Sequence, residues 1–145
     1  MRYYGYYMDE PMKISLPAEK LRALKVGLIY LFGSRAEGVA GPSSDFDVGI
    51  VFTDPAIARG NTTEVYNALY DIFSDVFDLS NFRNIDIVFL ERAPLELRFD
   101  AISHGAPLFE FSQEFRLNFE ERTGALYRDF KPILKELNRV VLEKI

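Results

Sequence analysis

Two aspartates separated by one residue, Asp45 and Asp47, stand at the start of an apolar segment that has the length of a strand. Residues i and i+2 of an extended segment point to the same side, so both carboxylates leave one face of the strand. Aspartate is depleted in strands, and two carboxylates on one face repel each other unless a positive charge lies between them. Mg²⁺ supplies such a charge and binds carboxylate oxygens together with water and substrate phosphates. The pair therefore indicates a magnesium site, although an isolated Asp-x-Asp is usually a solvated turn.

A third acid, Asp86, lies within another apolar segment, Asn84 to Leu90. If the two segments are neighbouring strands, the Asp86 carboxylate faces the first pair and helps to hold a second metal ion about 3.5–4 Å from the first. Two ions at this separation stabilise both the attacking and the leaving oxygen of an in-line displacement. The three acids together therefore predict metal-assisted chemistry at a phosphate.

A glycine and a serine, Gly33 and Ser34, end an earlier apolar run, and ten residues separate Ser34 from Asp45. Glycine lets the backbone approach a ligand closely, and the serine offers a hydroxyl. The turn can therefore hold a triphosphate through backbone N–H groups and one side chain. Arg35, the next residue, can add positive charge to the phosphates, and an ordinary surface ion pair explains it equally well.

The hydrophobic pattern predicts the elements that position these residues. Apolar runs indicate strands at 26–32, 46–52 and 84–90, and residues 33–44 are typical of a loop. Helical spacing indicates helices at 17–25 (with Ser15 as the N-cap), at 61–77 and at 95–103. Residues 114–145 form one long amphipathic helix or a helix pair, kinked near Pro132, and residues 1–13 are an irregular lead-in. Strands that alternate with helices predict an α/β domain.

The composition excludes several classes of function. The chain has 145 residues, enough for one domain with a substantial core. Its 17 basic and 22 acidic residues give a formal net charge of −5, whereas a dedicated nucleic-acid binder needs a basic face. It has no cysteine and one histidine, His104, which excludes thiolate zinc sites and multi-histidine metal sites. No signal peptide and no apolar run long enough for a bilayer are visible, so we expect a cytoplasmic protein without a membrane partner.

The sequence resembles the signature of the polymerase-β-like nucleotidyltransferase superfamily. The features that match are Gly33-Ser34, ten further residues, Asp45-x-Asp47 and the later strand acid Asp86. The phrase 43–47 (Ser-Ser-Asp-Phe-Asp) and the arginine after Ser34 resemble its small branch, the minimal nucleotidyltransferases (MNT). The resemblance covers residues 26–110. The phrase 127–132 is more loosely similar to the tail of MNT antitoxins that pair with HEPN-domain toxins.

The resemblance implies a mixed sheet of the polymerase-β palm type, flanked by helices. It also implies a catalytic core with its lead-in over residues 1–110 and a helical arm of the same domain over 111–145. By resemblance, the catalytic and metal-binding residues are Asp45, Asp47 and Asp86, with two Mg²⁺ ions, and the nucleotide-binding residues are Gly33, Ser34 and Arg35. The implied activity is transfer of AMP from ATP to a hydroxyl, such as that of a tyrosine, on a HEPN toxin encoded nearby.

Two other functions stay open at this point. The chain can act as a non-catalytic antitoxin that neutralises its partner by binding, or as a small-molecule nucleotidyltransferase of the antibiotic-modifying kind. The helical arm carries an apolar stripe that includes Ile133, Leu137 and Val141, so we expect a homo- or hetero-oligomeric interface there.

Overall fold

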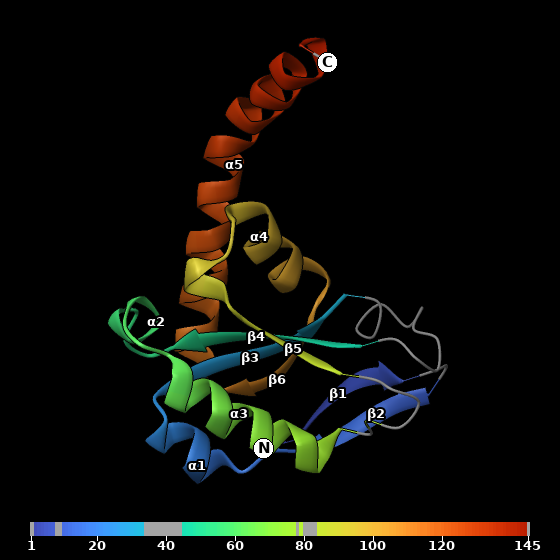
Figure 1. The fold of residues 1–145 in the computed structure, drawn as a ribbon, viewed down its shortest axis with the longest axis vertical. Helices are drawn as coiled ribbons and strands as arrows, with labels where there is room; N and C mark the ends of the chain where they lie inside the picture. Colours follow the sequence, from blue (N-terminus) through green and yellow to red (C-terminus); the bar gives the residue numbers. More distant parts are fainter. Residues whose placement is uncertain (1, 8–9, 34–44, 78, 80–83, 145) are drawn as a thin grey trace.

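The centre of the fold is a four-stranded mixed sheet with the strand order β5-β4-β3-β6 (Figure 1). The strands are β3 (Val26–Phe32), β4 (Phe46–Phe52), β5 (Ile85–Phe89) and β6 (Ala106–Glu110). β3 pairs antiparallel with both β4 and β6, whereas β4 and β5 are parallel. The computed structural model describes residues 2–7, 10–33, 45–77, 79 and 84–144, and it describes side chains from Ser15 onward.

Helices cover both faces of this sheet (Figure 1). On one face lie α1 (Ala18–Ala23) and α3 (Thr63–Val76), and on the other lie α4 (Leu95–His104) and the first part of α5 (Gln113–Glu143). The short helix α2 (Ala56–Arg59) follows β4, and the 3-10 turn η1 (Leu90–Arg92) follows β5. Because both faces are covered, β3 and β4 are nearly continuous apolar runs, and Asp47 is the one residue in them that is not buried.

Alternate side chains of β4 enter two separate cores. The larger core, between the sheet and the α1–α3 layer, includes Phe46, Ile50, Phe52 and Phe73. The smaller core, between the sheet and the α4–α5 layer, includes Leu28, Tyr30, Val51 and Phe119. Asp47 lies four residues before Val51 in the same strand, so its side chain leaves the sheet on the face that α4 and α5 cover.

The predicted fold class, a mixed sheet flanked by helices with a C-terminal helical arm, is confirmed. The strands and helices predicted before residue 104 are present, with bounds that differ by two residues or fewer. Two further elements, α2 and β6, do not follow from periodicity: α2 has four residues, and β6 begins two residues after α4 ends. The loop predicted at 33–44 lies outside the described residues from position 34 onward.

The prediction of an irregular N-terminal lead-in is wrong. β1 (Arg2–Tyr7) and β2 (Glu10–Ser15) form an antiparallel hairpin, and β1 lies beside β6. The tyrosines of the first strand explain this outcome, since aromatic residues favour extended backbone. Ser15 is the last residue of β2 and not the N-cap of α1. The N-cap of α1 is Pro17, which makes no side-chain hydrogen bond there.

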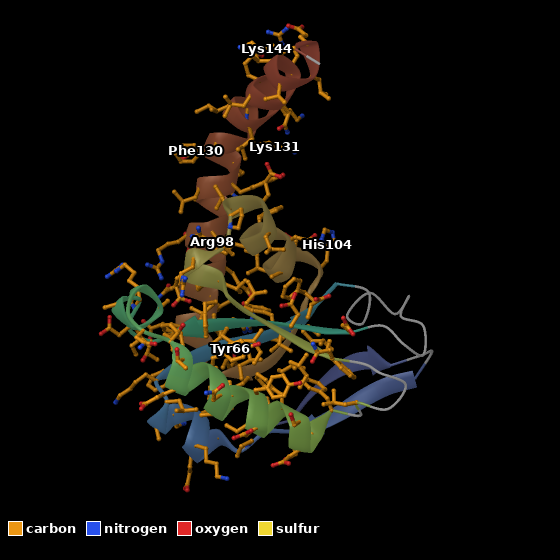
Figure 2. All side chains as sticks on the ribbon, in the orientation of Figure 1. Tyr66, Arg98, His104, Phe130, Lys131 and Lys144 are labelled. Carbon is orange, nitrogen blue, oxygen red and sulfur yellow. The ribbon has the colours of Figure 1, made fainter. Side chains whose placement is uncertain are left out.

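The C-terminal segment is a single helix, α5, that continues through Pro132. Figure 2 shows α5 changing direction near the labelled Phe130 and Lys131. A bend is expected there because proline removes one i→i−4 hydrogen bond and its ring crowds the preceding turn. At its start, the Ser112 hydroxyl accepts a hydrogen bond from the N–H of Phe115 at 3.0 Å, which caps the helix.

A polar network ties the first half of α5 to the sheet. The buried hydroxyl of Tyr30 donates to Glu120 Oε1 at 3.0 Å, and burial raises the pKa of Tyr30. Arg116 bridges Glu120 at 3.1 Å and Glu110 of β6 at 2.6 Å. Beyond this network α5 extends away from the sheet (Figure 1). Within the described part of the chain, no helix has both the length and the apolar character to cross a membrane.

Candidate functional site

The structure places Asp45, Asp47 and Asp86 at one end of the parallel strand pair β4–β5. Asp47 and Asp86 are register partners on these neighbouring strands, and Asp45 precedes β4 by one residue. Adjacent strands lie about 4.8 Å apart, so register partners present their side chains side by side on one face. We call the three residues the acidic end of β4. The strand pairing that the sequence left conditional is therefore present.

Burial and electrostatic repulsion both act on Asp47 in the acidic end. The pKa of Asp47 is raised, first by partial burial and then by the negative charges of Asp86 and Asp45. Asp45 and Asp86 are exposed, whereas Asp47 is half-buried. A cation bound here would relieve the repulsion and lower the pKa of Asp47, because opposite charge favours the ionised carboxylate.

Gly33 lies directly against the Asp47 carboxylate. Its φ of +74° falls in the left-handed region, and a Cβ atom added to it would lie 2.3 Å from Asp47 Oδ2. Only glycine suits both the conformation and the space. The backbone at the end of β3 therefore lies directly beside the Asp47 carboxylate. Ser34 and Arg35, the other predicted nucleotide-binding residues, lie outside the described residues.

Sequence reasoning missed two residues that position the acidic end, Asn84 and Tyr70. The backbone N–H of Asn84 donates to Asp45 Oδ1 at 3.0 Å, and its carbonyl accepts from the N–H of Phe46 at 2.9 Å. The Tyr70 hydroxyl of α3 donates to the side-chain oxygen of Asn84 at 2.9 Å. These bonds fix the start of β5 against the start of β4. The one sequence signal was a polar residue directly before an apolar strand, which is common at strand ends.

The donor set of the acidic end fits Mg²⁺ by its chemistry. All of its side-chain donors are carboxylate oxygens, and the charges of Asp86 and Asp45 add to partial burial in raising the pKa of Asp47. Within the described residues, no three His, Asp or Glu side chains are arranged to hold a metal ion together. Mg²⁺ is commonly bound by one or two carboxylates, with water and substrate phosphates as its other ligands. Asp47 and one neighbouring carboxylate are sufficient for that mode.

The fold is that of a nucleotidyltransferase domain. The family model for the polymerase beta nucleotidyltransferase domain matches residues 18–114, and the chain belongs to that family. This match covers β3, β4 and β5 and therefore the whole acidic end. The family-level resemblance predicted from sequence is confirmed. A comparison with curated proteins gives no match.

Similar solved structures come from toxin–antitoxin complexes. One, a toxin–antitoxin with AMP-PNP, is 26% identical in sequence and has a TM-score of 0.61. The match covers 86% of this chain and 94% of the other chain. A second, a mutant of the MntA-HpeT toxin–antitoxin, is 23% identical and has a TM-score of 0.60, and the match covers 88% of this chain and 99% of the other chain. A third comes from a tri-AMPylated Shewanella oneidensis HEPN toxin in complex with MNT antitoxin. It is 21% identical and has a TM-score of 0.59, and the match covers 86% of this chain and 94% of the other chain. Nearly the full length of each of these chains shares this fold.

Proposed function

We propose that this protein is an MNT-type antitoxin that transfers AMP from ATP to a hydroxyl, such as that of a tyrosine, on a HEPN-type toxin. The observation that carries the proposal is the pairing of Asp47 with Asp86 in register, with the Gly33 backbone against Asp47. Two structural neighbours support it, one crystallised with AMP-PNP and one containing a tri-AMPylated HEPN toxin. Nucleotide transfer also fits the family model, which matches residues 18–114 and includes all three acids of the acidic end.

In this proposal each residue of the site has a distinct role. Asp45 and Asp47 hold Mg²⁺, which supplies positive charge to the phosphates when bound, and the acidic end offers room for a second ion. The turn at Gly33, Ser34 and Arg35 holds the triphosphate. Such positioning converts a bimolecular reaction into an effectively unimolecular one.

Asp86 acts as the proton acceptor. Its carboxylate is exposed, so an incoming hydroxyl can reach it. The hydroxyl gives its proton to Asp86 as its oxygen bonds to the α-phosphorus of ATP. The bond from that phosphorus to the bridging oxygen breaks in line, and pyrophosphate leaves with the electron pair. The products are the adenylylated partner and pyrophosphate.

The outer half of α5 is the proposed partner surface. Ile133, Leu137 and Val141 recur at helical spacing and are 52%, 56% and 58% exposed. Large apolar side chains repeated along one exposed helix face are typical of a helix that binds a groove or another helix. The partner in this proposal is a helical HEPN-type protein encoded nearby, in the cytoplasm, and neither nucleic acid nor a membrane takes part directly.

A pair of charge substitutions tests the partner surface. Leu137→Glu places a carboxylate on the apolar stripe, whereas Asn138→Glu adds the same charge at the next exposed position. We expect Leu137→Glu to weaken the complex with the partner at least tenfold and Asn138→Glu to leave it within about twofold, by titration calorimetry. Equal effects of the two substitutions would rule out the stripe as the interface.

Isotope position in ATP tests the reaction itself. The protein is incubated with Mg²⁺ and its partner, together with ATP labelled at either the α- or the γ-phosphate. Nucleotidyl transfer predicts that α-label becomes attached to the partner and that γ-label leaves as pyrophosphate. Attachment of γ-label would identify a phosphotransferase instead. A tight complex with no attached label would favour the non-catalytic antitoxin, and label recovered only on added small alcohols would favour a small-molecule nucleotidyltransferase.

A further inference from the structure

A second concave site lies at the other end of β4. A cavity of about 410 Å³ opens where the strand ends at Phe52, bounded by α2, η1, α4 and α5. Its lining includes three arginines, Arg59, Arg98 and Arg122, from three different helices. Figure 2 labels Arg98 close to α5, at the beginning of α4. We call this cavity the arginine end of β4.

The three arginines carry positive charge that Glu91, the one acid in the lining, offsets only in part. Within the described residues, none of them forms a salt bridge. Arg98 Nε is buried and has no hydrogen-bond partner, and Arg98 Nη2 reaches only the carbonyl of Ala93 at 3.4 Å. A buried donor without a partner destabilises the folded protein. The Arg98 guanidinium therefore has a free N–H that can donate to an acceptor atom of a ligand.

Glu91 is the one acidic side chain in the lining, and it is already engaged. Both of its carboxylate oxygens accept from the backbone N–H of Phe52, at 3.2 and 3.3 Å. Burial raises the pKa of Glu91 to about 7, although the charge of Arg98 opposes this shift. With three arginines and one glutamate, the cavity lining carries a net charge of +2 when Glu91 is ionised and +3 when Glu91 is protonated.

Apolar side chains form much of the remaining wall, among them Phe115, Phe119 and Leu126. A volume of a few hundred Å³ with apolar walls and a few converging polar groups is typical of a site for a small organic ligand. Guanidinium groups suit phosphate and carboxylate oxygens, to which they donate two parallel hydrogen bonds. A bare inorganic anion would leave the apolar walls unused, and a neutral organic molecule would leave the arginines unpaired.

We propose that the arginine end is a binding site for a small organic phosphate, with its phosphate on Arg98 and Arg122 and its apolar part against Phe115 and Phe119. The site is separate from the acidic end and does not depend on the proposed transfer reaction. The five residue-to-residue steps of strand from Asp47 to Phe52 span about 17 Å. Leu90 fills the space between, since a Cβ atom on Gly49 would lie 2.9 Å from its side chain.

Phenyl phosphate is a suitable probe because it has the proposed chemistry without being a nucleotide. The full-length protein is titrated by calorimetry with phenyl phosphate, with phenol and with inorganic phosphate, in a chelator that removes divalent cations. Backbone amide shifts in the same titrations locate the ligand. We expect phenyl phosphate to bind more tightly than either fragment and to shift residues 51–53 and 122–123 rather than Asp47 and Asp86.

Arginine variants then test the contacts. We expect Arg98→Met, which keeps the apolar stem, and Arg122→Gln each to weaken phenyl phosphate binding about tenfold or more, since each removes a charged hydrogen-bond donor. Arg128→Gln removes an exposed arginine of α5 outside the cavity and should change binding by less than twofold. If Arg98→Met fails to fold, the exposed Arg122 decides the result. No binding by the wild type, equal binding by all variants, or shifts centred on the acidic end would each overturn the proposal.

Discussion

The two ends of β4 carry opposite charge on the same face of one sheet. At its start lie three carboxylates, where partial burial and the charges of Asp86 and Asp45 raise the pKa of Asp47. At its far end, three arginines line a cavity that contains one acid, Glu91. Both groups are unfavourable when empty, because like charges gather without compensation. Each end is therefore expected to gain stability from a ligand of the opposite charge, by mass action.

The two ends differ in how the chain assembles them. The acidic end needs two neighbouring strands, and two of its residues lie within three positions of each other. The arginine end draws one residue from each of three helices, at positions 59, 98 and 122. A short spacing pattern can reveal the first kind of site, whereas only the folded chain reveals the second. The following experiments perturb one end at a time.

The largest effect is expected from removing charge at the acidic end. Asp45→Asn together with Asp47→Asn should lower AMP transfer at least about a hundredfold, since stabilisation of charge by a bound metal contributes several kcal/mol to the transition state. Relief of repulsion should leave the melting temperature without Mg²⁺ unchanged or higher. Initial rates and thermal melts measure the two outcomes. Near-wild-type transfer by the double variant would exclude this metal assignment.

A smaller effect at the same end is expected from Gly33→Ala. An alanine in the left-handed region costs about 1–2 kcal/mol, and its Cβ must displace the Asp47 carboxylate. We expect a matching loss of unfolding free energy in denaturant and at least tenfold slower transfer. Gly60→Ala is the control, because the nearest atom to its added Cβ is 3.8 Å away and its φ is −92°. Equal losses in the two variants would show that Gly33 has no special role.

The arginine end should reveal itself through pH. The Glu91 carboxyl has a raised pKa of about 7 in the folded protein, against an ordinary value of 4.5. Between these values the unfolded chain releases a proton that the folded chain keeps, so stability falls as pH rises from about 4.5 to 7. Glu91→Gln should make the fall in unfolding free energy between pH 4.5 and pH 7 smaller by about 1–2 kcal/mol, a range that allows for the partial exposure of Glu91. Denaturant midpoints at several pH values measure it, and an unchanged slope in the variant would contradict the assignment.

The smallest effect is expected from Tyr70→Phe, which removes one hydrogen bond behind the acidic end. A net cost of about 0.5–1.5 kcal/mol is typical for such a bond. If Tyr70 positions Asn84 and through it Asp45, kcat should fall while the KM for ATP stays nearly constant. Tyr66→Phe is the control, since Tyr66 lies one turn earlier on α3 and forms no hydrogen bond through its hydroxyl within the described residues. A fall in stability with unchanged kcat would mean that Tyr70 has a structural role alone.

Much of the central sheet could be predicted because its strands are buried on both faces. Such strands must be continuous apolar runs, and an aspartate within one is conspicuous, which singled out Asp47 and Asp86. The register that pairs them could not be predicted, because it depends on the order of strands in the sheet. The hairpin of β1 and β2 was missed since neither strand has the buried pattern of a core element. Asn84, Tyr70 and the three arginines act through tertiary contacts, which no local spacing records.

The most direct test of the account is the intact mass of the partner toxin. The toxin is incubated with ATP and Mg²⁺ together with either the wild-type protein or the variant that carries Asn at positions 45 and 47, and both mixtures are examined by mass spectrometry. The account predicts that the wild type adds one or more adenylyl groups to the toxin and that the variant adds none while still binding it. A toxin of unchanged mass after incubation with the wild type, in a complex that demonstrably forms, would contradict it.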